Sequence, residues 1–259
     1  MNEQAKVKMQ TPVLTNEQIE SFNNTGYLVA RNAFSADDMA IIERWAGEVE
    51  AMPEESGKQW VYWEDSQTEP GKKIMSRIEK IKDYHAGFAE LTEVLKVPVD
   101  QLLGERSALF KEKINFKKPG GDGFKPHQDS QAGWDTYADF FISVLVCIDE
   151  ATVENGCLQI VGGEHSKGLY TSFKPIPDDE IAKMDVIPVP TKPGDIIFFD
   201  SFAPHSSEPN HTDKTRRIYF ATYNRASAGD HRQAYYQDKH KTYPPDIDRL
   251  ADKEYVFRV

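Results

Sequence analysis

His127 and Asp129 are the first residues whose types and spacing could do chemistry. On an extended chain, residues two positions apart point to the same side, so an imidazole and a carboxylate at this spacing can bind one metal ion. The chain contains a second pair with the same spacing, His211 and Asp213. That pair lies in a polar, turn-like stretch with no predicted strand before it, so we expect it to be solvated.

A third candidate ligand is His205, where a predicted strand that begins at Asp195 ends. Two histidines and one carboxylate on one face of an iron ion leave three coordination positions open, as in non-haem Fe(II) oxygenases. Those positions take a bidentate 2-oxo acid and O2. The far carboxylate of that acid requires a fixed, permanently charged partner, for which arginine is the best side chain. Arg216 follows His205 by 11 positions, where another predicted strand opens.

Further segments, taken in their order and spacing, resemble the phytanoyl-CoA dioxygenase family of Fe(II)/2-oxoglutarate oxygenases. These segments are residues 16–29, 113–121, 154–168, 193–195 and 205–210, followed by Arg216 and Arg217. The resemblance implies a double-stranded β-helix (jelly-roll, cupin-like) core, with residues 16–29 forming an opening helix and strand. It also implies Fe(II) bound by His127, Asp129 and His205, 2-oxoglutarate bound by Arg216, and O2 as the second co-substrate.

Alternation along residues 110–116 separates two faces of a predicted strand. Lys111, Lys113 and Asn115 share one face, and Phe110, Ile114 and Phe116 share the other. The resemblance places the polar face toward the oxo acid, which makes Lys113 and Asn115 candidate partners of its carboxylates. The alternative is that Lys113 lies on a solvated sheet face.

Alternation does not decide between Arg216 and Arg217, because the residues in step with each of them are apolar. The spacing in the family favours Arg216 as the partner of 2-oxoglutarate. We therefore expect Arg217 to make a structural ion pair.

Two patches bear on the substrate. Residues 111–125 hold five lysines against two acidic residues, which suggests an anionic substrate group. Residues 59–65 form an aromatic cluster that ends in Glu64 and Asp65, a composition suited to binding an ammonium group. The alternative for this cluster is a hydrophobic staple that fixes a loop onto the core. We assign four aromatic residues to the substrate site: Trp60, Tyr62, Trp63 and Trp134.

Both patches together suit a small zwitterion, and residues 239–249 resemble bacterial family members that hydroxylate 2-aminoethylphosphonate. We therefore predict a 2-oxoglutarate-dependent dioxygenase that hydroxylates an unactivated C–H bond of a small polar substrate, with this aminophosphonate as first choice. The alternatives are a hydroxylase of an acyl-CoA or a compatible solute, and a non-catalytic β-barrel binding protein. A zinc hydrolase could use the same three ligands, but it gives Arg216 no role.

The elements that must position these residues fall into three stretches of one predicted domain, residues 1–259. Helical periodicity and capping signals dominate residues 15–104, with a break between two helices at Val97-Pro98. Short β-branched and aromatic runs follow at 109–116, 139–148, 157–161, 186–189, 195–199 and 217–223. This order predicts a mainly β, or α+β, fold: an antiparallel core over 105–225 with the N-terminal helices packed outside and a C-terminal extension, 226–259.

Composition limits the partners and the compartment. The net charge of −11 argues against nucleic acid and anionic membranes as main partners. The longest apolar run, residues 140–148, is about half the length of a membrane-spanning helix, and no apolar stretch follows the first charges as in a signal peptide. We expect a cytoplasmic chain in which Cys147 and Cys157 are buried thiols. The oligomeric state stays open.

Overall fold

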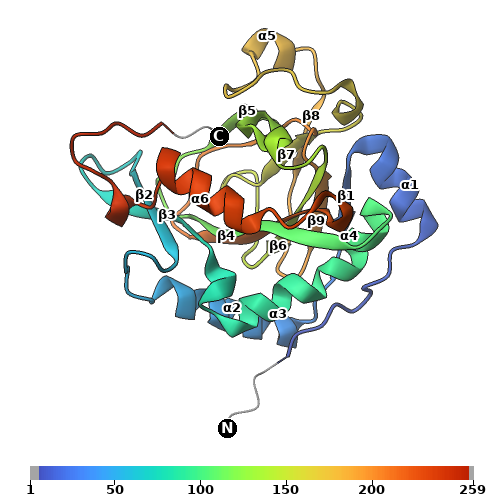
Figure 1. Ribbon diagram of the computed structural model, residues 1–259, viewed down its shortest axis with the longest axis horizontal. Helices are drawn as coiled ribbons and strands as arrows, with labels where there is room; N and C mark the ends of the chain where they lie inside the picture. The colour runs from blue at the N-terminus through green and yellow to red at the C-terminus, as the bar shows by residue number, and fades with distance from the viewer. Residues whose placement is uncertain (1–5, 257–259) are drawn as a thin grey trace.

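Two antiparallel sheets face each other in the computed structural model, which describes residues 6–256 (Figure 1). The larger sheet has the strand order β1-β9-β6-β11-β4-β3-β2, and the smaller has the order β5-β10-β7-β8. The strands are β1 (Tyr27–Ala30), β2 (Trp60–Asp65), β3 (Lys73–Glu79), β4 (Ser107–Lys117), β5 (Phe124–His127), β6 (Phe141–Cys147), β7 (Leu158–Val161), β8 (Val186–Val189), β9 (Ile196–Asp200), β10 (His205–Ser207) and β11 (Arg216–Arg225). This arrangement is the double-stranded β-helix that we predicted.

The helices are α1 (Asn16–Thr25), α2 (Ala36–Glu50), α3 (Ala86–Val94), α4 (Lys96–Leu103), α5 (Asp178–Ile181) and α6 (Arg232–Thr242). Helices α1 to α4 pack apolar side chains in a cluster outside the larger sheet, whereas α6 contacts β4 beside the inner aromatic residues and α5 buries no residue. Thr15 and Ser35 cap α1 and α2, and these caps are among the capping signals of residues 15–104. Figure 1 shows α2 and α3 on one side of the larger sheet, while β5, β7 and β8 lie on the other side. No helix of residues 6–256 is long and apolar enough to cross a membrane.

Alternation along β6 shows how the larger sheet serves two cores. Val144 and Val146 point outward and pack in a cluster with Ile42 of α2 and Phe88 of α3. Leu145, between them, points inward and packs in a second cluster with residues of the smaller sheet. The six predicted strands are confirmed to within two residues at each end. Cys147 and Cys157 are buried free thiols, as expected.

The stretch 15–104 contains more sheet than its helical periodicity predicted. Strands β2 and β3 lie within it and extend the larger sheet by pairing with β4. The predicted break between two short helices is present, but it lies at Leu95, where α3 and α4 meet, and not at Val97-Pro98. Pro98 stands in the first turn of α4, where a missing N–H leaves no intrahelical bond unmade.

A bulge in β4 changes the face to which Phe110 points. Thr222 of β11 is paired with Lys111, whereas the next residue, Tyr223, is paired with Leu109. The extra residue is Phe110. We predicted that it shares a face with Ile114 and Phe116, and the bulge makes this prediction wrong. Its ring packs among residues near the cavity that is described below: Trp134, Tyr137, Phe141 and Tyr235.

Candidate active site

A cavity of about 250 Å³ lies between the two sheets. Its walls come from β3, β4, β6, β9 and β11 of the larger sheet, from β5, β7 and β10 of the smaller sheet, and from α6. Five of the six residues that we assigned to iron and 2-oxoglutarate lie at the ends or on the inner faces of these strands. The sixth, Asp129, follows β5 at the start of a short 3₁₀ helix.

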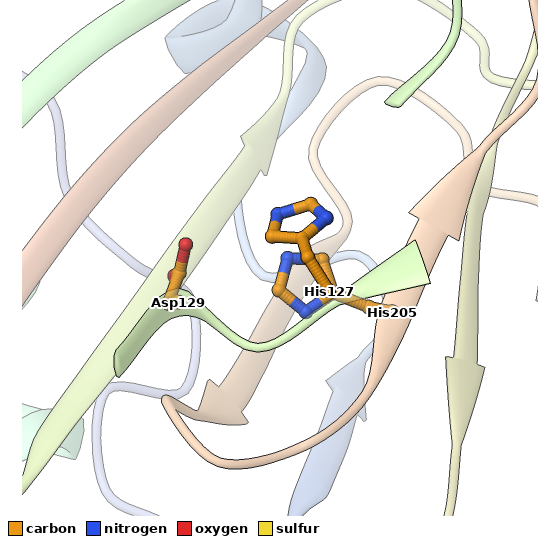
Figure 2. Close-up of side chains that lie close together, drawn as sticks. All are labelled: His127, Asp129 and His205. Carbon is orange, nitrogen blue, oxygen red and sulfur yellow. The ribbon is translucent and has the colours of Figure 1, made fainter. Parts of the chain in front are cut away.

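His127, Asp129 and His205 come together on one wall of this cavity. His127 ends β5 and is the register partner of His205, which begins β10. One ligand atom from each of the three side chains lies within 4.8 Å of the others (Figure 2). We predicted that His205 ends the strand that begins near Asp195, and this is wrong. Strand β9 stops at Asp200, and a turn separates it from β10, which His205 begins. The pair His211 and Asp213 is exposed, as expected.

Hydrogen bonds orient all three side chains toward a common point. Nδ1 of His127 lies 2.7 Å from the carbonyl oxygen of Lys125, and Nδ1 of His205 lies 3.0 Å from that of Ala203. A carbonyl only accepts, so each Nδ1 carries the proton and each Nε2 keeps its lone pair for a metal ion. Ser143 Oγ donates to Asp129 Oδ2 at 2.7 Å.

The electrostatics of the cavity keep the three groups in metal-binding form at neutral pH. Burial lowers the pKa of His127 to about 3, with the neighbouring His205 adding to the effect, and burial also lowers the pKa of His205. Burial alone would raise the pKa of Asp129, but the positive charge of Lys111, the two imidazoles and the Ser143 hydrogen bond lower it to about 2. The site thus presents two neutral imidazoles and one carboxylate, a donor set that suits iron(II).

Arg216 and Asn115 provide an anion site on neighbouring strands of the larger sheet. Both side chains are buried and line the cavity, and within residues 6–256 Arg216 Nε and Asn115 Oδ1 have no hydrogen-bond partner. Burial lowers the pKa of Arg216 to about 10. Buried polar groups in native proteins are almost always paired, so a ligand carboxylate that accepts from Arg216 Nε fits here, and the Asn115 amide can donate to it through Nδ2.

Arg217 points away from the cavity and makes the structural ion pair that we expected. Its Nε and Nη2 donate to the two carboxylate oxygens of Asp149 at 2.8 Å each, and Nη2 also contacts Glu43 at 3.1 Å. Lys113 lines the cavity, so the solvated alternative for it is wrong. Burial, and after it the charge of Lys111, lowers the pKa of Lys113 to about 7.

The aromatic cluster of residues 59–65 does not surround the cavity. Trp60 packs against Tyr236 and His240, and Tyr62 stacks on Tyr243. Trp63 donates its indole N–H to Glu54 at 2.9 Å. The prediction that these three rings bind an ammonium group is wrong, because the segment is strand β2 of the larger sheet and not a loop that closes over the site. Of the four assigned aromatic residues, Trp134 alone lines the cavity.

Several charged residues of the cavity were missing from the predicted site, among them Arg77, Glu79 and Lys239. Glu79 makes two ion pairs: Lys239 Nζ lies 2.6 Å from its Oε2, and Arg77 Nε lies 3.0 Å from its Oε1. Arg77 also lies over the ring of Tyr62, 4.3 Å from its centroid. The sequence did contain a signal for two of them: Arg77 and Glu79 stand two positions apart, which is the spacing of residues on one face of a strand. We had assigned this region to helix.

Comparisons with known proteins agree with this geometry. The family model "Phytanoyl-CoA dioxygenase (PhyH)" matches residues 22–218. A 2-aminoethylphosphonate dioxygenase from an uncultured bacterium, HF130_AEPn_1, is 35% identical over 248 residues, covering 93% of each chain. A methylphosphonate hydroxylase from Gimesia maris is 38% identical over 234 residues, covering 89% of this chain and 88% of that one.

Solved structures show the same fold. The apo form of EctD from S. alaskensis superposes with a TM-score of 0.72 at 26% identity, over 85% of this chain and 79% of that one. The EctD structure with 2-oxoglutarate and 5-hydroxyectoine gives a TM-score of 0.71 at 23% identity, over 88% and 86% of the two chains. With a family model that spans most of the chain and two relatives above 30% identity, the chain belongs to the phytanoyl-CoA dioxygenase family and is an Fe(II)- and 2-oxoglutarate-dependent dioxygenase.

Proposed function

We propose that the protein hydroxylates a small phosphonate, with 2-aminoethylphosphonate as the first candidate. The observation that carries the proposal is one cavity that holds the group His127, Asp129 and His205 together with the buried, unpaired Arg216 Nε. The substrate class is supported by two relatives named for phosphonates, which match this chain over about nine-tenths of its length.

In this proposal, His127, Asp129 and His205 hold Fe(II), and Arg216 binds the far carboxylate of 2-oxoglutarate. Asn115 and Lys113, which share the inner face of β4, bind and orient the same co-substrate. When bound, the iron with 2-oxoglutarate and O2 supplies the oxidation that converts C–H to C–OH.

The protein side chains position these groups and exclude water. Ser143 holds the Asp129 carboxylate in place, and a contact of 3.1 Å between Ser143 Oγ and Thr222 Oγ1 fixes Ser143 in turn. Phe199 packs against the His205 ring, with centroids 4.6 Å apart, and shields it from one side. Such support keeps the ligands in one geometry before substrate arrives.

The size of the cavity favours a small substrate over an acyl-CoA. A volume of about 250 Å³ lies below the range of about 300 to 1,000 Å³ typical of pockets for drug-sized ligands. The charged wall of Lys111, Lys113 and Arg77 also suits an anion better than an acyl chain.

The proposal is tested by supplying the protein with Fe(II), 2-oxoglutarate, O2 and one compound at a time, and by measuring succinate and hydroxylated product. The compounds are 2-aminoethylphosphonate, methylphosphonate, an acyl-CoA and a compatible solute. We expect succinate to form in step with hydroxylated phosphonate, and much more slowly without a phosphonate. Stimulation by the acyl-CoA or the solute, but by neither phosphonate, would contradict the proposal.

A further inference from the structure

The amino groups of two lysines of β4, Lys111 and Lys113, face the cavity without a hydrogen bond or ion pair to a carboxylate of the described chain, although Asp129 is near enough to Lys111 for the lysine to lower its pKa. Within residues 6–256, the hydrogen bonds and ion pairs include neither Nζ atom. Lys111 Nζ lies 3.9 Å from the centroid of Trp134, and Lys113 Nζ lies 5.0 Å from that of Phe220. A cation that is buried without an anion costs free energy, so an anion that enters from solution gains binding energy here.

The register of β4 separates these lysines from the arginine. In the pairing of β4 with β11, Arg216 lies opposite Lys117 and Thr222 lies opposite Lys111. Lys111 is therefore six positions along β4 from the residue opposite Arg216. Six residues of strand span about 20 Å. Thr222 contacts Ser143, which donates to Asp129, so Lys111 lies at the Asp129 end of the cavity and Arg216 at the other. An oxo acid that reaches from the metal ligands toward Arg216 therefore extends away from Lys111.

The acidic groups nearby are already engaged. Glu79 is paired with both Lys239 and Arg77, and these three groups together keep a net positive charge. Asp129 is oriented by Ser143 and belongs to the proposed iron ligands. Glu112 is paired with Arg232, and Asp238 is paired with Lys241. The cavity thus has an excess of positive charge that its own carboxylates do not neutralise.

We propose that Lys111, held over the ring of Trp134, binds the phosphonate group of the substrate at a subsite distinct from that of 2-oxoglutarate. This inference rests on the proposed function, since the phosphonate is the anion in question. The face of Trp134 fixes the ammonium group through a cation–π contact, leaving its N–H groups free to donate to phosphonate oxygens. Lys113 stands between Lys111 and Asn115 on the same face of β4, and it is the lysine that binds the oxo acid.

The test measures binding of 2-aminoethylphosphonate and of methylphosphonate to the anaerobic complex of the protein with Fe(II) and 2-oxoglutarate, by calorimetry. Lys111→Met and Lys111→Gln should each raise the Kd of both phosphonates by about tenfold to a hundredfold, the loss typical of a hydrogen bond to a charged group. The KM for 2-oxoglutarate should change by less than about twofold. Lys111→Arg, which keeps the charge, should recover most of the affinity.

Lys73→Met is the matched control, because it removes an exposed lysine of β3 whose side chain does not line the cavity. Its Kd for both phosphonates should equal that of the wild type. An unchanged Kd in both Lys111 variants would overturn the subsite, as would an equal loss of affinity for phosphonate and 2-oxoglutarate. If the wild type neither binds nor hydroxylates a phosphonate, the proposed function itself fails, and the subsite fails with it.

Discussion

Arg216 and Arg217 are neighbours with opposite roles, which makes them a sensitive test at the level of single residues. Arg216→Lys keeps the charge but loses the planar fork, so the KM for 2-oxoglutarate should rise by about tenfold to a hundredfold, corresponding to about 1.5 to 3 kcal/mol. Arg217 is paired with Asp149 outside the cavity, so Arg217→Lys should change this KM much less. Steady-state succinate assays measure both values.

Comparing the change in the KM for 2-oxoglutarate between Arg216→Lys and Arg217→Lys shows which arginine binds the co-substrate. A larger effect of Arg217→Lys on the KM for 2-oxoglutarate would mean that the register of β11 is shifted by one residue and that the cavity described here is wrong at this wall. A comparable fall in stability of both variants, with unchanged KM, would remove Arg216 from the co-substrate site.

Short-range spacing made the metal-ligand candidates visible in the sequence. His127 and Asp129 stand two positions apart, and the extended backbone from His127 through Gln128 brings their side chains to the same side. Glu79 and Lys239 could not be found in this way, because 160 positions separate them and only the tertiary fold brings them together. The roles of Trp60, Tyr62 and Trp63 were misjudged for a related reason: composition shows an aromatic cluster but not the side on which it packs.

At the level of elements, helix α6 is tied to strand β3 by the buried pair of Lys239 and Glu79. Glu79→Ala leaves Lys239 and Arg77 in the interior without this carboxylate, and it should lower the free energy of unfolding at pH 7 by about 3 to 5 kcal/mol. Urea denaturation measures this change. Lys241→Ala, which breaks the exposed pair with Asp238 on the same helix, should cost no more than about 1 kcal/mol.

The same carboxylate predicts a pH dependence. Burial alone would raise the pKa of Glu79, but Lys239 and Arg77 lower it from 4.5 to about 2. A lowered folded-state pKa contributes stability above pH 4.5 that is lost as the pH falls toward 2, amounting to about 3 kcal/mol. The Glu79→Gln variant should lose less stability than the wild type across this interval. An equal loss in both proteins would show that Glu79 is not the group responsible.

Long-range pairing explains which elements were not predicted. Strands β4, β6 and β9 carry continuous apolar or alternating runs that reveal a strand locally. Strand β3 mixes Lys73, Arg77 and Glu79 with apolar residues, and its extended state depends on pairing with β4. The bulge at Phe110 likewise arises from the register of β4 against β11, which the sequence of β4 alone does not show.

At the scale of the whole molecule, the charge distribution differs sharply between the chain and its cavity. The chain carries a net charge of −11, yet the cavity wall gathers Arg77, Lys111, Lys113, Lys239 and Arg216. Repulsion by the acidic remainder disfavours polyanions such as nucleic acid, while the enclosed cations retain affinity for small anions. The two-sheet fold makes this separation possible, because it encloses the inner face of β4 and leaves most of the acidic residues outside the cavity.

The central claim is that the cavity between the two sheets holds iron through His127, Asp129 and His205. Anaerobic titration with Fe(II), read by metal content after gel filtration, tests this most directly in the wild type and in His127→Ala, His205→Ala and His211→Ala. The wild type and His211→Ala, whose exposed pair repeats the spacing outside the cavity, should retain about one iron per chain, and the other two variants should retain almost none. Wild-type iron content in His127→Ala or His205→Ala would contradict the claim.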